Sequence, residues 1–550
     1  MVRSSAGARH LGRRAPSLAR AGPKTEGSGA ARKLVEQNRS ENRSATRSRG
    51  QRIGLWLGPL IFLLILLLDL EPGRPEVTRM AAVAVLMATW WITDAIPLFA
   101  TALLPLLLFP ILGIERTGET APIYFNSTIV LFLGGFMIAL TMEKWDVHRR
   151  IALWVIRAVG GGPARIVLGF MLAAAFLSMW ISNTATAIMM VPVGLAVILR
   201  MEEQFGRGRT RAFSVSIMLG IAYACSAGGI ATLVGTPPNL SLQRIFAITF
   251  PDAPHISFGV WFVMALPIAA LMLVFAWILI TRVFFRVPDE VSVDREVVES
   301  EMRKLGPVAF EERAILAVFA STALLWVFRA PIEIGRLTIP GWSSLLPYGH
   351  LIDDGTVAIT MACILFLVPT RSPGAKSATV MGPGVVRRLP WNIVLLFGGG
   401  FALAHGFQTT GLARFVGEGF SGLSTVPPLV LIFVICLAMT FLTELTSNTA
   451  TTEMVLPIFA AVAVATGVHP LLLMVPATLS ASCAFMMPVA TPPNAVVFGS
   501  NRVRIAEMAR VGLFLNLIGA IVITLIFRAL GPLLFGIEPG VLPDWAHPGS

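Results

Sequence analysis

Charged residues are scarce in this chain. Only 13% of its 550 residues are Asp, Glu, Lys or Arg, and 55% are apolar, whereas soluble domains carry about 25% charged residues. The chain instead contains many apolar runs of about 17–25 residues, the length that crosses a bilayer as a helix. This composition excludes a string of soluble domains and predicts an all-α polytopic membrane protein.

Cysteine and histidine are also rare. The four cysteines (Cys225, Cys363, Cys436 and Cys483) lie in apolar stretches without metal-ligand spacing, so we expect small buried side chains and no disulfide framework. No Glu-x-x-His pair occurs, and His148 and His405 are interpreted as loop or interface residues. These absences argue against a membrane-embedded enzyme, which needs an activated nucleophile or a metal cluster.

The positive charge is concentrated at the N-terminus. Residues 1–52 hold 13 Lys or Arg and 3 acidic residues, so they account for +10 of the net charge of +12. The segment lacks the aromatic residues of a nucleic-acid-binding domain and the apolar stretch of a signal peptide. We expect a disordered basic cytoplasmic tail or an over-extended start codon.

One tripeptide, Ser-Asn-Thr, occurs twice, at residues 182–184 and 447–449. The copies are 265 residues apart, and other stretches repeat in the same order in both halves. The repeated stretches are LFLGGF (131–136) with LFGGGF (396–401), and GTPPN (235–239) with ATPPN (490–494). Interrupted apolar segments at matched positions in two halves are typical of a transporter binding site.

The apolar pattern predicts about 11 transmembrane helices arranged as two repeats. We divide the chain into a tail (1–52), a first half (53–285), a cytoplasmic linker (286–313), a second half (314–530) and a C-terminal tail (531–550). The first half contains a hairpin (164–199) and a broken helix (212–250), and the second contains a hairpin (427–464) and a broken helix (471–500).

Each hairpin has two arms of about 15–18 residues, which is short for a full crossing. Basic residues flank the first hairpin on both sides, so both its ends are expected in the cytoplasm. The second hairpin has flanks poor in Lys and Arg and should enter from outside, which makes the repeats inverted. The alternative is two ordinary spanning helices. An odd number of crossings places the N-terminus inside and the C-terminus outside.

A hairpin tip within the membrane leaves backbone groups without helical partners, which is tolerated only in protein or beside a watery cavity. The helix that starts after each tripeptide presents a positive end to an anion, while hydroxyl, amide and carbonyl oxygens suit Na⁺. Helix capping is the alternative role for Ser, Asn and Thr. The two Thr-Pro-Pro-Asn stretches predict helix breaks, either as ion sites or as structural kinks.

Two carboxylates flank the second tripeptide. Glu444 and Glu453 have no equivalents in the first half, where Met179 and Ile188 occupy the matching positions. Intramembrane carboxylates suggest function, but we favour a salt-bridged or hydrogen-bonded structural role over substrate contact. Asp94 is expected in a solvated loop, as is the stretch EKWDVHRR at residues 143–150.

These paired motifs resemble those of the divalent anion:sodium symporter family, over about residues 53–530. The resemblance implies two opposed re-entrant hairpins, a homodimer and an elevator-type motion of the hairpin-bearing domain. It implies a multi-pass protein of the bacterial inner membrane, which couples Na⁺ influx to uptake of a small dianionic C4-dicarboxylate such as succinate, malate or fumarate. The partners are then the bilayer, Na⁺ and the anion, with no nucleic acid.

The resemblance also implies which residues bind the ions. Two or more Na⁺ would be cotransported, and the metal ligands of the two sites would be Ser178, Ser182, Asn183 and Gly235, and Thr443, Thr446, Asn448 and Ala490. The substrate would contact Asn183, Thr184, Thr236, Ser447, Asn448, Thr449 and Thr491. All matching hydroxyl positions are occupied, which favours a symporter; an anion exchanger and a sulfate or citrate carrier remain alternatives.

The inverted arrangement predicts opposite accessibility of the two hairpins. A cysteine replacing Arg200, after the first hairpin, should react with an impermeant thiol reagent from the cytoplasmic face only. A cysteine replacing Val464, in the second hairpin, should react from the outer face only. Labelling of both from one face would contradict the inverted repeats.

Overall fold

The computed structural model describes residues 47–287, 295–373, 377–420, 422, 425–538 and 540–547. Of the predicted tail, residues 1–46 lie outside this range, and the last residues already belong to the first helix. The helices up to the linker are α2 (Arg49–Leu66), α3 (Pro75–Thr93), α4 (Leu98–Thr101), α5 (Leu104–Ile111), α6 (Thr117–Thr120), α7 (Ser127–Lys144), α8 (Val147–Val159), α9 (Pro163–Ser178), α10 (Asn183–Phe205), α11 (Arg207–Ile230), α12 (Pro237–Thr249) and α13 (Phe258–Ile278).

The rest of the chain repeats much of this order. Its elements are α14 (Arg295–Leu305), α15 (Phe310–Val327), β1 (Ile332–Ile334), β2 (Leu337–Ile339), α16 (Asp354–Leu367), α17 (Trp391–Thr410), α18 (Leu412–Glu418), α19 (Pro428–Thr443), α20 (Asn448–Thr466), α21 (Leu471–Ala481), α22 (Pro492–Gly499) and α23 (Ile505–Phe535). Short 3₁₀ or π turns are η1 (Ala121–Tyr124), η2 (Leu279–Phe284), η3 (Trp342–Leu345), η4 (Gly349–Leu351), η5 (Pro383–Arg388) and η7 (Asp544–Ala546). The series α7–α13 is thus matched in order by α17–α23.

The fold-class prediction of an all-α membrane protein is confirmed. Within the described residues, 8 helices are long and apolar enough to cross a membrane, and five shorter apolar helices include both arms α9 and α19. Both predicted hairpins are helix pairs joined at the tripeptide, and both predicted breaks interrupt a helix. The number of crossings, the inverted orientation and the domain boundaries stay predictions.

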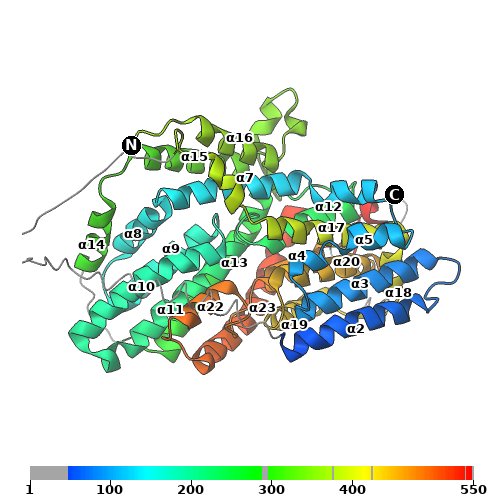
Figure 1. Cartoon of the computed structure of the whole chain (residues 1–550), viewed down its shortest axis with the longest axis horizontal. Helices are drawn as coiled ribbons and strands as arrows, with labels where there is room; N and C mark the ends of the chain where they lie inside the picture. Colours follow the sequence, from blue (N-terminus) through cyan, green and yellow to red (C-terminus); the bar gives the residue numbers. More distant parts are fainter. Residues whose placement is uncertain are drawn as a thin grey trace, which may run out of the picture. The chain divides into compact units, whose positions relative to one another are not determined.

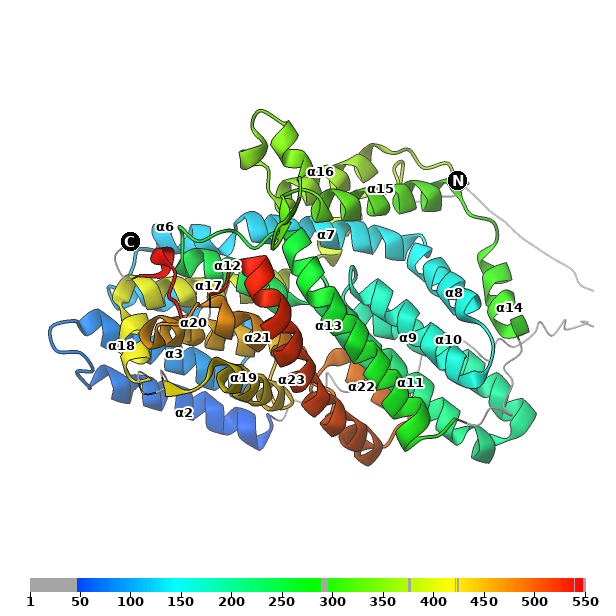
Figure 2. The same cartoon turned by 180° about the vertical axis from the view of Figure 1, so that it is seen from behind.

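The helices from residue 50 onward belong to one structural unit. Helix α11 lies against α9 and α10 in Figure 1, and every residue of its most apolar 18-residue window is buried. The long helices α13 and α23 run side by side in Figure 2 and close the unit on the other side of α11. The second hairpin, α19 and α20, packs on α21 in the same way as the first packs on α11.

The repeated glycine stretches let helices approach closely. A Cβ added to Gly134 of α7 would lie 2.7 Å from the Ala358 backbone on α16. A Cβ added to Gly399 of α17 would lie 2.4 Å from the Ala102 carbonyl oxygen beside α4. Real side chains do not tolerate such distances, so both contacts require glycine. This explains why LFLGGF and LFGGGF recur in the two halves.

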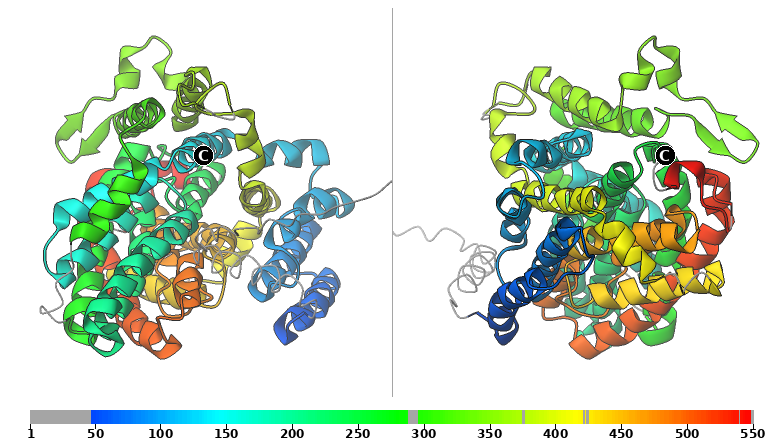
Figure 3. Two further views of the ribbon diagram at one scale, coloured as in Figure 1. Left: turned by 60° about the vertical axis from the view of Figure 1, so that its left-hand side comes forward. Right: turned by 90° about the vertical axis from the view of Figure 1, so that its right-hand side faces the viewer.

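Two local predictions were wrong. The stretch expected as a solvated loop ends in the first turn of α8, and both His148 and Arg150 are buried there. Arg150 is accommodated because its guanidinium lies 2.8 Å from Glu312 of α15 and donates to the Gly306 carbonyl at 3.0 Å. Cys363, which was expected to be buried, is exposed. A small β1–β2 hairpin follows α15 (Figure 3).

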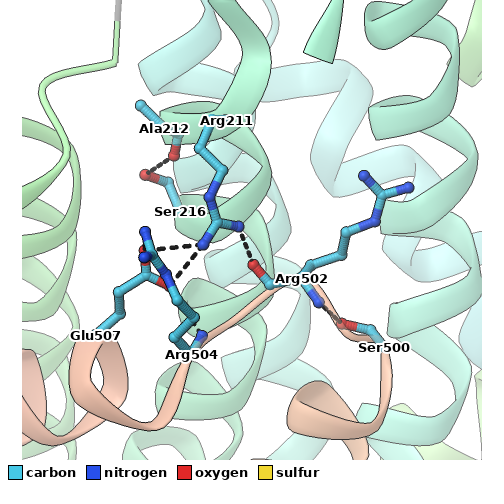
Figure 4. A network of polar contacts seen from close by, with 7 residues as sticks. All are labelled: Arg211, Ala212, Ser216, Ser500, Arg502, Arg504 and Glu507. Atoms are coloured by element: carbon cyan, nitrogen blue, oxygen red, sulfur yellow. Dashed lines mark hydrogen bonds and ion pairs between the residues drawn. The ribbon is translucent and has the colours of Figure 1, made fainter. Parts of the chain in front are cut away.

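A polar network joins the start of α11 to the start of α23 (Figure 4). Arg211 donates two hydrogen bonds of 2.8 Å to the Glu507 carboxylate and a third to the Arg502 carbonyl. Arg504 also pairs with Glu507 at 3.1 Å. Arg211 belongs to the basic flank of the first hairpin, which was predicted to face the cytoplasm. The network ties this flank to the start of α23.

Removing the carboxylate from the buried ion pair should destabilise the protein strongly. Arg150 is 3% and Glu312 7% exposed, so Glu312→Ala leaves a buried charge without its partner, at a cost of about 3–5 kcal/mol. The control is Glu203→Ala, whose pair with Arg200 is largely exposed and should contribute about 0–1 kcal/mol. Thermal unfolding of the purified protein in detergent would show the difference; equal midpoints would contradict it.

Candidate functional site

Both tripeptides and both helix breaks line one cavity of about 520 Å³. The seven residues expected to bind the substrate all line it: Asn183, Thr184, Thr236, Ser447, Asn448, Thr449 and Thr491. Six of the eight expected metal ligands also line it: Asn183 and Asn448, which are on both lists, and Ser182, Gly235, Thr446 and Ala490. Ser178 and Thr443 are fully buried behind it. Segments up to 402 residues apart in sequence, from Trp91 to Pro493, therefore meet at one place.

Four helices begin at this cavity. Ser182 and Ser447 are the N-caps of α10 and α20, and Thr236 and Thr491 are the N-caps of α12 and α22. The Ser182 hydroxyl accepts from Ala185 N at 3.2 Å, so these serines do have the capping role as well. Each helix start carries about half a positive charge. Four such ends at one cavity favour a negatively charged ligand.

The side chains of the cavity bring no positive charge of their own. In the described part of the chain, its lining contains no Lys, Arg or His, and Asp94 is its one charged residue. The lining is otherwise hydroxyl, amide and apolar groups. An anion held here would be bound by helix ends and neutral donors, and one or more cations beside it would offset its charge.

Three oxygens converge behind the first tripeptide. The Ser178 hydroxyl lies 2.5 Å from the Asn183 side-chain oxygen and 2.7 Å from the Cys225 carbonyl oxygen. A hydroxyl has one hydrogen, so it donates to only one of them at a time. Gly229 makes room, since a Cβ there would lie 2.5 Å from the Asn183 oxygen. An oxygen-rich group of this kind suits a small hard cation, and the Cys225 carbonyl had not been predicted.

The second tripeptide has a related arrangement. The Thr443 hydroxyl donates to the Thr440 carbonyl at 3.1 Å, and the Thr446 hydroxyl to the Leu442 carbonyl at 2.8 Å. The Thr446 hydroxyl oxygen also lies 2.6 Å from the Thr451 hydroxyl and can accept from it. Each of the two oxygens, Thr443 and Thr446, still keeps a lone pair that could accept or bind a cation. The Asn448 side-chain oxygen is buried and has no hydrogen-bond partner among the described residues. A buried acceptor without a donor is costly, and a bound cation would satisfy it.

The asparagines of the two breaks hold the interrupted helices in shape. Asn239 donates to the carbonyls of Gly229 (3.3 Å) and Thr232 (2.7 Å) at the end of α11. The residue 255 positions later, Asn494, donates to the carbonyls of Ala484 (3.2 Å) and Met487 (3.0 Å), which are also 255 positions later. Sequence reasoning assigned no role to these amides. Their matching positions at the end of each Thr-Pro-Pro-Asn stretch could have indicated a shared role at the breaks.

Glu444 has the structural role that we favoured. It is buried, and its carboxylate accepts from the backbone N–H groups of Phe485 (2.7 Å), Met486 (2.9 Å) and Met487 (3.0 Å). It also accepts from the Asn516 amide at 2.7 Å. In the first half the matching position is Met179, whose carbonyl accepts from Thr232 of the corresponding break. Glu444 therefore shapes the second break and does not line the cavity.

Asp94 lies in an exposed turn at the end of α3, as expected of a solvated position. It is the C-cap of α3 in a left-handed conformation (φ 49°) and lines the cavity. Trp91, Phe132 and Phe136 form part of the apolar wall. Phe132 and Phe136 belong to a repeated stretch, which could have marked them as cavity residues. Nothing in the sequence linked α3 to the tripeptides.

The chain matches known membrane transport proteins over most of its length. A family described as the sodium:sulfate symporter transmembrane region matches residues 53–537. The sodium-dependent dicarboxylate transporter SdcS of Staphylococcus saprophyticus is 40% identical over 509 residues, covering 91% of this chain and 95% of that protein. The SdcS protein of Staphylococcus aureus is 40% identical over 497 residues, covering 89% and 93%.

Two solved structures share the fold. The YdaH transporter of Alcanivorax borkumensis has a TM-score of 0.50 at 14% identity, covering 87% of this chain and 99% of that one. Neisseria gonorrhoeae MtrF, described with a class of antimetabolite efflux pumps, has a TM-score of 0.51 at 13% identity, covering 76% and 84%. At this identity the likeness concerns the fold alone.

Replacing Glu444 by its amide should loosen the second break. In Glu444→Gln an –NH₂ group faces backbone N–H donors, so at least one buried donor loses its acceptor, at about 1–3 kcal/mol. We expect a lower midpoint of thermal unfolding and weaker transport. The control, Glu418→Gln, changes an exposed carboxylate on α18 and should leave the midpoint nearly unchanged. An unchanged midpoint in Glu444→Gln would show that the carboxylate is not needed there.

Proposed function

Since the chain belongs to the sodium:sulfate symporter family, we propose that it is a secondary active transporter that couples Na⁺ influx to uptake of C4-dicarboxylates such as succinate, malate and fumarate. Membership of this family makes the protein a membrane transporter rather than an enzyme. The choice of dicarboxylates is supported by the 40% identical relatives, which are named sodium-dependent dicarboxylate transporters.

One observation carries the proposal: the starts of α10, α12, α20 and α22 meet at a single cavity whose lining has no basic side chain among the described residues. Helix starts and hydroxyl groups bind carboxylates. Without a fixed cationic side chain, the anion's charge is balanced best when Na⁺ is present. Electrostatics alone would then make binding of the anion depend on binding of Na⁺.

Asn183 and Asn448 link the two ligands. Each is the first residue of its helix and lines the cavity. The Asn183 amide oxygen lies against the Ser178 hydroxyl, and the Asn448 amide oxygen is buried without a hydrogen-bond partner among the described residues. The amide oxygen serves a cation and the amide nitrogen serves the anion. We assign one Na⁺ to Ser178, Asn183 and neighbouring carbonyls, and a second to Thr443, Thr446 and Asn448. Bound Na⁺ orders each tip, and the ordered tip binds the dicarboxylate.

Transport requires the cavity to open to each side of the membrane in turn. We propose an elevator-type movement of the hairpin-bearing part and a homodimer, with the N-terminus cytoplasmic and the C-terminus outside. Support comes from the pairing of the motifs and from the basic segments around Arg211 and Arg502, which are typical of a cytoplasmic face. Mass photometry of the detergent-purified protein measures the oligomer directly.

A sulfate carrier is the second candidate, because the description of the matching family names sulfate. Purified protein in liposomes with an inward Na⁺ gradient, offered labelled succinate together with unlabelled sulfate, citrate or malate, separates the candidates. We expect malate to compete, and sulfate and citrate not to compete. Competition by sulfate alone would replace the dicarboxylate with sulfate as the substrate.

Replacing either Asn183 or Asn448 should weaken the binding of both Na⁺ and succinate. Asn183→Ala and Asn448→Ala should raise the Na⁺ concentration and the succinate concentration needed for half-maximal uptake by about 5–150-fold, the range of a 1–3 kcal/mol coupling. Thr184→Ala and Thr449→Ala should affect succinate more than Na⁺. Uptake into liposomes, measured over a grid of both concentrations, separates the two effects.

Gln204→Ala is the matched control, because it removes an exposed amide from the last turn of the same helix as Asn183. It should behave as the wild type. If succinate affinity is independent of Na⁺ in the wild type and follows pH instead, the transporter is driven by protons and the proposal fails.

A further inference from the structure

Glu453 differs from every other buried carboxylate that the structure describes. Five Asp or Glu side chains are buried there. Glu312 and Asp354 pair with arginines, and Glu311 and Glu444 accept hydrogen bonds from two or more backbone N–H groups. Glu453 is completely buried, and its one hydrogen-bond partner among the described residues is the hydroxyl of Ser241. Its other oxygen, Oε2, has no hydrogen-bond partner in the part of the chain that the structure describes.

The space around this carboxyl group is closed. Glu453 lies on α20, Ser241 lies on α12, and Gly400 of α17 covers the remaining side. A Cβ added to Gly400 would lie 1.9 Å from Glu453 Oε2, so the carboxyl group rests directly on the glycine backbone. An ionised carboxylate enclosed in this way, with one hydrogen bond and no cation, is strongly unfavourable.

No other charge lies in ion-pair contact with Glu453 within the described residues, and it is the only charged residue of α20. Of the elements packed against α20, α21 has no titratable residue, and α19 has only Cys436, which lies against Pro476 and Thr524. The charged or titratable groups on the others are Arg244 (α12), His405 (α17, bonded to Glu115), Arg414 and Glu418 (α18, paired together), and Glu76 and Arg79 (α3).

The hydrogen atoms can be counted. Ser241 Oγ lies within hydrogen-bond distance of Glu453 Oε1 and is 3.3 Å from the Pro237 carbonyl oxygen. The hydroxyl has one hydrogen and faces two acceptors, so one contact lacks a donor if Glu453 is ionised. If Glu453 carries a proton on Oε1, the acid donates to Ser241 and Ser241 donates to Pro237. Every close contact then has its hydrogen.

We propose that Glu453 is a proton-binding site, which holds a proton at neutral pH in this conformation and joins the second hairpin to the first broken helix. The chain of bonds runs from α20 through Ser241 to Pro237, which lines the cavity. The proton thereby fixes the start of α12 beside the substrate position. It leaves to water only when α20 separates from α12 and α17, so its release reports that movement. Ile188 occupies the matching position in the first half, and this site has no counterpart there.

Infrared spectroscopy of the full-length protein in liposomes tests the proposal. At pH 7 the wild type should show the carbonyl band of a protonated carboxyl group, and Glu453→Gln should lose one carboxyl equivalent of it. Ser241→Ala keeps the acid but removes its partner, so the band should shift in frequency without loss of intensity. A wild type without the band, or a band of unchanged intensity in Glu453→Gln, overturns the proposal.

Thermal unfolding supplies a second, independent readout. Glutamine mimics the neutral acid, so Glu453→Gln should unfold close to the wild-type midpoint. Glu444→Gln, nine residues away on the same hairpin, should unfold lower because the wild-type carboxylate accepts from three backbone N–H groups. If Glu453→Gln falls as far as Glu444→Gln, or fails to fold, Glu453 is needed as a carboxylate and the proposal is wrong. Neither measurement depends on which anion is transported.

Discussion

The structure depends on how backbone groups are satisfied where helices stop inside an apolar region. Four helices end and four begin around one cavity, and each interruption frees carbonyls or N–H groups that lipid cannot pair. The protein meets this requirement with side chains from nearby segments. Asn239 and Asn494 bind the carbonyls of the two breaks, and Glu444 binds three N–H groups of the second. The groups left over face the cavity, where ligands can bind them.

The same requirement explains why the two halves are similar but not identical. Both breaks carry the same pair of amide–carbonyl hydrogen bonds, 255 residues apart. The N–H groups of the second break have a buried carboxylate as acceptor, whereas the first break is tied through Thr232 to the Met179 carbonyl. The Glu453–Ser241 pair also occurs once. The two halves share their motifs, but only the second hairpin carries buried carboxylates, Glu444 and Glu453. This difference would allow the two hairpins to respond differently to protons.

Close helix approach is the second condition for the cavity. Gly134, Gly399 and Gly229 each leave room that a methyl group would fill, against Ala358, Ala102 and Asn183 respectively. Such packing brings the neutral amide of Asn183 to the end of α9 and the Cys225 carbonyl. The buried pair of Arg150 and Glu312 and the network around Arg211 then hold α8 and α11 to distant segments.

The sequence by itself determined the class of the protein and the list of motifs. Composition and apolar runs identified a helical membrane protein, and the matched spacing identified which short polar stretches belong together, because repeated interruptions of apolar helices are costly without a purpose. Only the tertiary structure decided which residues contact one another across these segments. Nothing local to Asn239 shows that it binds carbonyls ten residues earlier, and nothing local to Arg150 shows that Glu312, 162 residues later, permits its burial. The partners of Glu453 lie on α12 and α17. Pairing across such separations depends on how helices pack, which propensity and hydropathy do not encode.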